Sequence, residues 1–333
     1  MDVVTGPAVT DSAPASDPAT AVAPLRALHA EVAKVVLGQD GVISGVLVGL
    51  LAGGHVLLEG VPGTAKTMLV RALATASGLG TSRVQFTPDL MPSDVTGSLV
   101  FDQQGGAFEY RPGPVFTNLL LADEINRTPP KTQASLLEAM EERQVTVDGV
   151  SRALPDPFCV VATQNPVEYE GTYPLPEAQL DRFLVQLVVP LPDAAAERRM
   201  LAAHVAGFDP RDLAAAGVRP VTGPEELRAA IAAVRTLHCA PEILDYVVAL
   251  VRATRAAPAV ALGVSPRGAT ALLAAARAWA FLSARNYVTP DDVQAMARPV
   301  LRHRMVLRPE AELEGATAAA VLDAVLAAVP APR

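Results

Sequence analysis

A glycine-rich segment between an apolar run and a helical pattern carries the clearest chemical signal in the sequence. It reads Gly60-Val61-Pro62-Gly63-Thr64-Ala65-Lys66-Thr67 and follows the run His55–Leu58. This context predicts a phosphate-binding loop (P-loop), in which backbone N–H groups of the loop and of the following helix surround phosphate oxygens. Lys66 would reach the β- and γ-phosphates of a nucleoside triphosphate, and the Thr67 hydroxyl would bind Mg²⁺.

The predicted nucleotide-binding set comprises these eight positions and Met68, the next residue. Ala65 departs from the usual pattern, because the residue before the lysine is normally a glycine. Alanine costs little at this position if its φ is negative. The substitution is therefore compatible with phosphate binding.

Two acidic residues follow another apolar run, Leu119–Ala122. The run predicts a strand whose end places Asp123 and Glu124 at the carboxyl edge of a parallel sheet, where ligands bind. We expect Asp123 to hold Mg²⁺ through water. We expect Glu124 to orient and polarise the attacking water, because phosphoryl transfer depends mainly on positioning and charge stabilisation.

Three further polar residues are candidates for contacts with the triphosphate. Asn165 follows the run Phe158–Ala162 and could contact the attacking water or the γ-phosphate. Arg182 precedes the last apolar run, and Arg267 follows Ser265-Pro266, a pair typical of a helix start. A cation in the first turn opposes the helix dipole, so Arg267 needs an anion nearby, and a γ-phosphate would serve.

The segments that must position these residues alternate between short apolar runs and helical patterns from Leu25 to Pro190. This alternation predicts an α/β domain with a parallel sheet and crossover helices. The expected strands are His55–Leu58, Arg83–Phe86, Asn118–Ala122, Phe158–Ala162 and Leu184–Val189. Residues 191–333 predict an all-helical second domain. Its expected helices are Ala194–Ala206, Pro224–Leu237, Pro241–Ala253, Pro266–Ala284, Pro290–Leu301 and Glu312–Val329.

Composition limits the remaining possibilities. Residues 1–24 are rich in Ala, Pro, Ser and Thr without apolar periodicity, which predicts a disordered tail. The net charge of −8 argues against a broad nucleic-acid or anionic-membrane surface. The N-terminus lacks the pattern of a secretory signal, no membrane span is expected, and the two cysteines suit reduced thiols in a cytoplasmic protein.

The motifs resemble, in this order, those of the AAA+ ATPases: Walker A at 60–67, Walker B at 119–124, sensor 1, an arginine finger and sensor 2. The segment 123–183 is similar to the MoxR family. The similarity lies in Asp123-Glu124-Ile125-Asn126-Arg127, Pro129-Pro130-Lys131-Thr132-Gln133, Leu136-Leu137-Glu138-Ala139-Met140, Ala162-Thr163-Gln164-Asn165-Pro166 and Glu170-Gly171-Thr172-Tyr173-Pro174-Leu175-Pro176-Glu177-Ala178-Gln179-Leu180-Asp181-Arg182-Phe183. Ala65 also matches that family, which commonly has alanine before the lysine.

The resemblance implies an αβα core with a helical lid, ATP and Mg²⁺ as cofactors, and a hexameric ring with ATP at subunit interfaces. It implies a helix-2 insert at about 88–114, a hairpin at about 144–154 with its turn at Asp148-Gly149, and an adenine-side segment at Gly38-Gln39. The implied role is chaperone-like remodelling of a client, often beside a protein with a von Willebrand factor A domain. Arg182 is the implied trans-acting arginine, with Arg127 as the alternative.

Two other functions remain open at the level of sequence. The same branch of the AAA+ ATPases includes replicative helicases, so a DNA-stimulated motor is one alternative, although the acidic net charge speaks against it. A nucleotide-gated scaffold with little turnover is the other. The presence of both Glu124 and Arg182 favours hydrolysis instead.

Overall fold

The core of the protein is a five-stranded parallel sheet, seen in a computed structural model that describes residues 18–165 and 171–332. The strand order is β2-β5-β8-β1-β9. Its strands are β1 (Val56–Glu59), β2 (Thr81–Gln85), β5 (Leu119–Asp123), β8 (Cys159–Gln164) and β9 (Val185–Val188). All five strands expected from the apolar runs are confirmed, with ends shifted by one or two residues.

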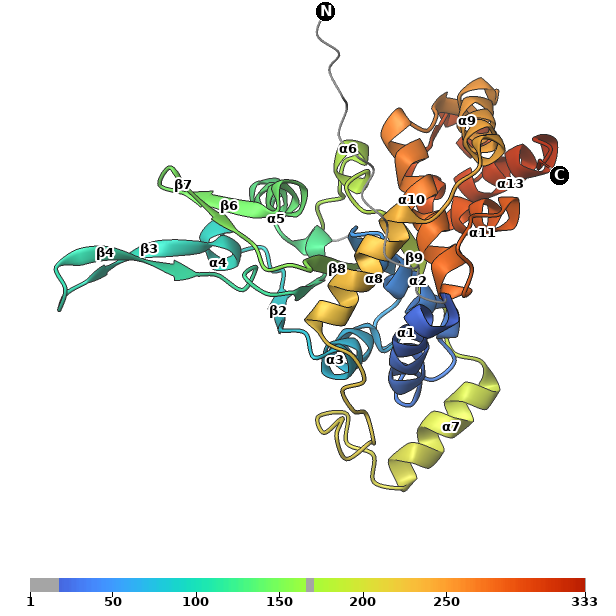
Figure 1. The fold of residues 1–333 in the computed structure, drawn as a ribbon. Coiled ribbons are helices and arrows are strands. Elements are labelled where there is room, and N and C mark those ends of the chain that lie inside the picture. The colour runs from blue at the N-terminus through green and yellow to red at the C-terminus, as the bar shows by residue number, and fades with distance from the viewer. Residues whose placement is uncertain (1–17, 166–170, 333) are drawn as a thin grey trace, which may run out of the picture.

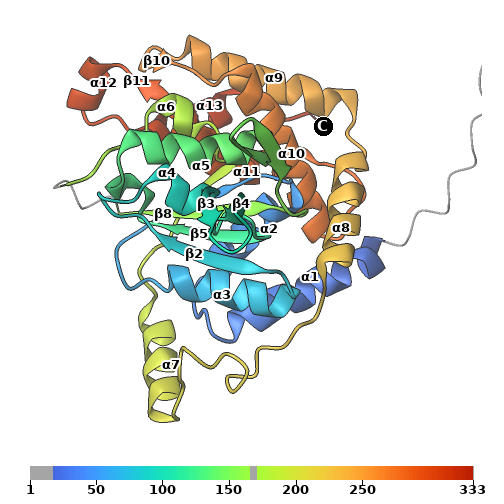
Figure 2. The ribbon, with the colours of Figure 1, turned by 90° about the vertical axis from the view of Figure 1, so that its left-hand side faces the viewer.

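Both faces of the sheet are covered, which explains why the inner strands β1, β5 and β8 are nearly continuous apolar runs. One face packs against α1 (Pro18–Ala33), α2 (Asp40–Leu51) and α3 (Lys66–Ser77). The other face packs against α4 (Pro92–Thr96) and α5 (Pro130–Glu142). In Figure 2, α4 and α5 lie above the strands, and α1 and α3 lie below them. Alternate residues of one strand therefore enter different cores: Leu119 and Leu121 join the first, and Leu120 the second.

A helical domain follows the last sheet strand and packs on the α1–α2 side of the core. Its helices are α7 (Ala194–Val205), α8 (Pro224–Thr236), α9 (Pro241–Ala256), α10 (Pro266–Leu282), α11 (Pro290–Leu301), α12 (Pro309–Leu313) and α13 (Ala318–Ala328). One small antiparallel pair, β10 (Val260–Leu262) with β11 (Val306–Leu307), lies among these helices. The αβα core with a helical lid is confirmed, and this pair is a minor departure from an all-helical lid.

Two antiparallel hairpins project from the same side of the core (Figure 1). The first, β3 (Gly97–Asp102) with β4 (Ala107–Pro112), lies within the predicted insert. The second, β6 (Gln144–Val147) with β7 (Val150–Ala153), turns at Asp148 and Gly149, both with positive φ as a type I′ turn requires. The hairpins touch where the Arg152 guanidinium lies 3.9 Å from the centre of the Tyr110 ring.

Two predicted boundaries are wrong. The tail was expected to reach residue 24, but α1 begins at Pro18 and buries Val22 completely, while residues 1–17 lie outside the described part of the chain. A single helix was expected over Glu312–Val329, but two helices form there. Gly315 has a φ of 86°, and the Thr317 side chain accepts a hydrogen bond from the Ala320 N–H and so starts a new helix.

Candidate functional site

The site predicted from the P-loop, the two acids and Asn165 forms at the carboxyl edge of the sheet. Strand β8 lies between β1 and β5, so the segments that follow these three strands meet. They enclose a cavity of about 330 Å³, which is lined by Pro62, Gly63, Thr64, Ala65, Lys66, Thr67, Met68, Asp123, Glu124, Thr163, Gln164 and Asn165. Every polar residue expected at the phosphates, except the two arginines, therefore lines one cavity.

The loop backbone has positive φ angles at Gly63 and Ala65, which glycine adopts easily and alanine does not. A Cβ at Gly60 would lie 2.8 Å from the Val189 carbonyl oxygen, so only glycine fits there without a shift. Gly63 has a φ of 84°. Ala65 has a φ of 62° and a ψ of 19°, which makes the expected tolerance through a negative φ wrong. The loop needs a left-handed residue before Lys66, and alanine adopts it at a cost of about 1–2 kcal/mol.

Lys66 lies at the start of α3 with its amine turned toward the loop. Its Nζ donates to the carbonyl oxygens of Gly60 and Val61 at 2.6 and 3.0 Å. Burial lowers the pKa of Lys66, while the charges of Asp123 and Glu124 oppose that shift. A partly desolvated cation beside open backbone turns is suited to binding phosphate oxygens.

Asp123 is held by groups from three neighbouring elements. Its Oδ1 accepts from the Thr163 hydroxyl at 2.6 Å, and its Oδ2 accepts from the Thr67 hydroxyl at 3.4 Å and from the Arg83 Nη2 at 2.8 Å. A hydroxyl and a carboxylate that converge in this way are hard oxygen ligands of the kind Mg²⁺ prefers. The expected pair of Thr67 and Asp123 therefore fits a magnesium ion bound together with phosphates.

Glu124 lies at a sharp bend after β5, with a φ of 57°. Its backbone N–H donates to the Thr163 hydroxyl oxygen at 2.9 Å. Its Oε2 accepts from the Gln85 side-chain amide at 2.7 Å and pairs with the Arg127 Nε at 3.1 Å. The Glu124 carboxylate is thus held at the edge of the cavity by Gln85 of β2 and by Arg127 in the turn that follows Glu124.

Arg83, Gln85 and Thr163 were not among the predicted site residues. Arg83 and Gln85 lie on β2, whose register places Gln85 opposite Asp123. Nothing in the local sequence shows which strand lies beside β5, so their contacts could not be inferred. Thr163 lies in the quoted segment before Asn165, and its position at the end of a buried strand was the available signal.

A second, mainly apolar cavity of about 290 Å³ adjoins the first, and Ala65 and Met68 line both. Its other walls come from the segment before α2, from α7 and from the segment that follows α7: Lys34, Val35, Leu37, Met200, Leu201, Ala203, His204 and Phe208. The predicted Gly38-Gln39 segment lies beside it. Gln39 donates to the Pro190 carbonyl at 2.8 Å, and a Cβ at Gly38 would meet the Ala196 Cβ at 2.8 Å.

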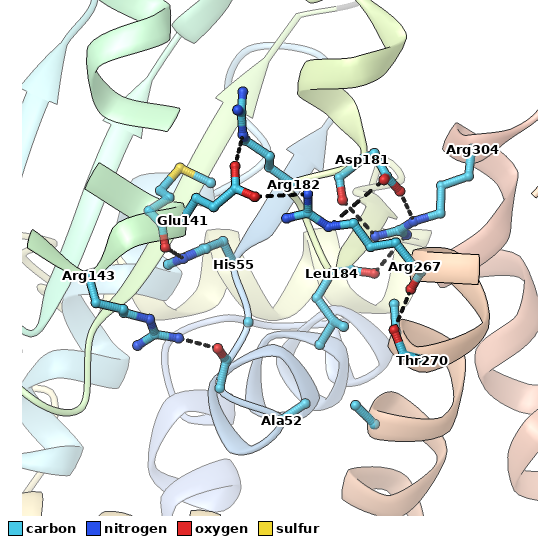
Figure 3. A pocket seen from close by; sticks show the side chains of 15 residues that line it. Ala52, His55, Glu141, Arg143, Asp181, Arg182, Leu184, Arg267, Thr270 and Arg304 are labelled. Carbon is cyan, nitrogen blue, oxygen red and sulfur yellow. Dashed lines mark hydrogen bonds and ion pairs between the residues drawn. The ribbon is translucent and has the colours of Figure 1, made fainter. Parts of the chain in front are cut away.

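The two predicted arginines lie elsewhere, around a third cavity of about 410 Å³ (Figure 3). Arg182 precedes β9, and the Leu184 N–H binds the carbonyl of His55 at the start of β1. This cavity is therefore at the amino edge of the sheet, opposite the P-loop. Arg267 lies there too, and its guanidinium meets Glu141 at 3.1 Å and Asp181 at 3.9 Å. The anion that we expected beside Arg267 is, within this chain, a pair of carboxylates.

The structure thus divides the predicted site residues into two groups. Lys66, Thr67, Asp123, Glu124 and Asn165 line one cavity, and Arg182 and Arg267 line another. Arg127, the alternative to Arg182, lies with the first group because it pairs with Glu124.

Comparisons with known proteins agree with the fold. Residues 55–185 match the model of the ATPase family associated with various cellular activities (AAA), and residues 252–325 match an AAA lid domain. A crystal structure from Cytophaga hutchinsonii, of a protein assigned as an ATPase, superposes with a TM-score of 0.87 at 38% identity. The superposition covers 95% of this chain and 97% of that one. A P-loop core followed by a matching lid defines an AAA+ ATPase.

Similar sequences narrow the class. The chain is 44% identical over 312 residues to Chaperone MoxR1 of Mycobacterium tuberculosis, which covers 91% of this chain and 81% of that protein. It is 37% identical over 320 residues to Protein MoxR of Paracoccus denitrificans (90% and 93% covered) and 50% identical over 299 residues to YeaC of Bacillus subtilis (90% and 92% covered). The chain therefore belongs to the MoxR family of AAA+ ATPases.

Over residues 18–165 and 171–332, no helix has both the length and the apolar character needed to cross a bilayer.

Proposed function

We propose that the chain hydrolyses ATP with Mg²⁺ and uses the energy to remodel a client protein. The observation that carries the first part is the single cavity shared by Lys66, Thr67, Asp123, Glu124 and Asn165. These residues come from the ends of three adjacent parallel strands and include a cation, two carboxylates and an amide. Together they match what phosphoryl transfer from ATP to water needs, which is mainly positioning and charge stabilisation.

Each residue has a role that its position supports. Lys66 would exchange its two carbonyl contacts for oxygens of the β- and γ-phosphates. Thr67 and Asp123 would hold Mg²⁺, which neutralises charge on the phosphates when it is bound. Glu124 would orient the attacking water from the cavity edge, and Asn165 would contact that water or the γ-phosphate. The adjoining apolar cavity is suited to the adenine ring, since Ala65 and Met68 line both spaces.

Arg182 and Arg267 would complete the ATP site of a neighbouring subunit in a ring. Both lie at the amino edge of the sheet, whereas the P-loop lies at the carboxyl edge of the same strands. A strand the length of β1 spans roughly 13 Å, so one chain does not bring these arginines to its own phosphates without rearrangement. Arg127 is the weaker candidate for this role because it pairs with its own Glu124.

Two substitutions test the hydrolytic site. Lys66→Ala should abolish nucleotide binding, because the phosphates lose their pre-positioned cation. Glu124→Gln should keep binding but stop turnover, because it removes the water-orienting carboxylate and leaves the residues for Mg²⁺ in place. Equilibrium binding of a fluorescent ATP analogue, measured beside phosphate release, separates the two outcomes. Wild-type turnover by Glu124→Gln would show that the role given to Glu124 is wrong.

A mixing experiment tests the ring. Arg182→Ala should bind ATP almost normally and hydrolyse it on the order of 10³-fold more slowly, as loss of an arginine finger does in other NTPases. Adding Glu124→Gln chains should restore activity, because an Arg182→Ala subunit that receives Arg182 from a Glu124→Gln neighbour has a complete site. If activity stays absent in mixed rings whose composition has been confirmed, Arg182 does not act on its neighbour.

The remodelling role rests on a relative and on the two hairpins. The M. tuberculosis relative is named a chaperone. The hairpins β3–β4 and β6–β7 project together from the core (Figure 1). The Phe101 and Phe108 side chains of the first hairpin are exposed. We infer that these hairpins contact the client or an adaptor, for which a protein with a von Willebrand factor A domain is the candidate. The cytoplasm is the proposed location, and a hexamer is the proposed ring.

A further inference from the structure

We propose that Glu141 is a positioning residue that holds Arg182 and Arg267 together for the nucleotide of the neighbouring subunit. The inference rests on the proposed trans action of Arg182 and adds a residue that neither the motifs nor the P-loop chemistry identifies. Glu141 lies in the last turn of α5, and its side chain lies between the two guanidinium groups (Figure 3).

The two oxygens of Glu141 serve different arginines from different domains. Oε2 accepts from the Arg182 Nε at 2.7 Å, and Oε1 accepts from the Arg267 Nη1 at 3.1 Å. Arg182 belongs to the core, and Arg267 belongs to the first turn of lid helix α10. One carboxylate therefore fixes the relative position of two cations that would otherwise repel each other.

The support of Glu141 is rigid. Arg143, which ends α5 in a left-handed conformation, donates to the Phe158 carbonyl at 3.0 Å and to the Gly53 carbonyl. The Met140 carbonyl accepts from the Nε2 of buried His55 at 3.1 Å. The turn that carries Glu141 is thus joined to the sheet on both sides of Glu141, which is the arrangement that a positioning group requires.

The far side of the cavity is fixed as well. Arg304 is almost fully buried, and its Nε donates to the Asp181 Oδ1 at 2.6 Å. Its other nitrogens bind the backbone carbonyls of Asp181, Phe183 and Leu184 at 3.0, 2.7 and 3.2 Å. The segment that carries Arg182 is therefore held in place, and Glu141 completes the arrangement by fixing the guanidinium at its end.

The hydrogen-bonding capacity of arginine favours positioning over sequestration. A guanidinium has five N–H donors, and Glu141 accepts one from each arginine. Donors thus remain to bind phosphoryl oxygens while Glu141 keeps its contacts. The hydrogen bond from Arg182 and the charges of both arginines lower the pKa of Glu141, so the carboxylate is ionised at neutral pH.

The first test compares Glu141→Ala with Glu142→Gln, an exposed acid on the same turn. Glu141→Ala should lower kcat about 3–10-fold, because the arginines lose their common anchor, with little change in KM or in equilibrium ATP binding. Glu142→Gln should match the wild type. An unchanged or increased kcat for Glu141→Ala would overturn the proposal, since the carboxylate would then be neutral or inhibitory. A loss of ring assembly that accounts for the whole defect would also overturn it.

The second test asks whose ATP is affected. Adding inactive Glu124→Gln chains to Glu141→Ala chains should raise activity per Glu141→Ala chain, because the added subunits donate correctly held arginines. The double variant Glu124→Gln/Glu141→Ala should give no such rise. Equal effects of the single and the double variant would refute positioning in trans.

A parallel mixture of Arg182→Ala with Glu124→Gln distinguishes the role of Glu141 from the trans action of Arg182. If Arg182→Ala is rescued and Glu141→Ala is not, the role of Glu141 alone is wrong. If neither is rescued, the trans arrangement itself fails, and the inference fails with it.

Discussion

The buried His55 gives a prediction whose size follows from its surroundings. Its Nδ1 accepts from the Val160 N–H at 3.0 Å, and its Nε2 donates to the Met140 carbonyl at 3.1 Å. These two bonds fix the neutral tautomer, with the proton on Nε2. Burial, followed by the charge of Arg143, lowers the pKa of His55 from 6.5 to about 3.

The sign of the resulting pH dependence is clear. Between pH 6.5 and about 3, the unfolded chain binds a proton on His55 that the folded chain does not bind. The free energy of unfolding therefore falls as the pH falls through this range, by about 1.4 kcal/mol per pH unit from this group alone. From pH 7.5 to pH 5, His55 should account for a loss of about 2 kcal/mol.

The experiment compares the free energy of unfolding of the wild type and of His55→Gln at two pH values. His55→Gln should destabilise the protein by about 1–3 kcal/mol at pH 7.5, because two buried hydrogen bonds are disturbed. At pH 5 that deficit should shrink by about 2 kcal/mol, because the variant no longer carries the group that takes up the proton. Urea unfolding followed by circular dichroism at both pH values provides the numbers.

His204→Gln, on the exposed surface of α7, is the matched control and should show no such change in its deficit. His303 is also buried, with its pKa lowered to about 3, but it is present in both proteins and cancels. An equal deficit of His55→Gln at both pH values would refute the neutral buried state. The Met140 carbonyl would then no longer have a defined N–H donor in His55, and Arg143 would be the remaining link between the Glu141 turn and the sheet.

Two other substitutions test elements around the site. Gln85→Ala should raise basal phosphate release a few-fold at unchanged ATP affinity, because Glu124 loses the amide that holds its Oε2. A fall in turnover would instead show that Gln85 contributes to hydrolysis. Phe108→Ser, at a side chain that is 69% exposed and packed edge-on against Phe101, should leave basal ATPase activity within a few-fold and reduce partner binding or partner-stimulated activity. Loss of ring assembly in sedimentation, with partner binding retained, would show that the hairpin only packs against neighbouring subunits.

Tyr110 lies in the same hairpin as Phe108 but is less suitable for a substitution that tests partner contact. Its hydroxyl donates to the Thr96 carbonyl, and its ring packs against Arg152 of the second hairpin. Replacing it with serine would disturb the junction of the two hairpins. Its loss would therefore report on the shape of both hairpins, whereas the loss of Phe108 would report on the surface of one.

Most of the core could be predicted because strands buried on both faces leave uninterrupted apolar runs. Leu119–Ala122 is such a run, and the polar residues after it fall where parallel strands end. The start of α1 was missed because Val22 is an isolated apolar residue in an alanine- and proline-rich stretch, and only its burial against other helices makes the segment part of the fold. The left-handed φ of Ala65 was missed because the path of the loop, and not the residue type, determines it.

Contacts between distant segments were beyond local patterns. Glu141 looks like one of several acids on an amphipathic helix, and only the docking of α10 brings Arg267 to it. Arg267 was expected to need an anion, for which a γ-phosphate would serve, because a cation in the first turn opposes the helix dipole. Within the chain, the carboxylates of Glu141 and Asp181 lie beside it. Which anion satisfies that need depends on where the lid packs, and the sequence of α10 alone does not contain that information.

The position of the lid has a consequence for how the proposed ring would work. Arg267 and the arginine finger candidate of its own chain bind the same carboxylate, that of Glu141, whereas the P-loop of that chain borders α7 through the apolar cavity. In a ring, the first turn of α10 would therefore respond to the neighbour's γ-phosphate, and α7 would respond to the chain's own adenine ring. Residues 206–223 join α7 to α8, so a response of α7 would reach the other lid helices along this segment. In the proposed ring, helices of one chain would thus border two nucleotides, and binding at either site could affect the other through the segment that joins α7 to α8.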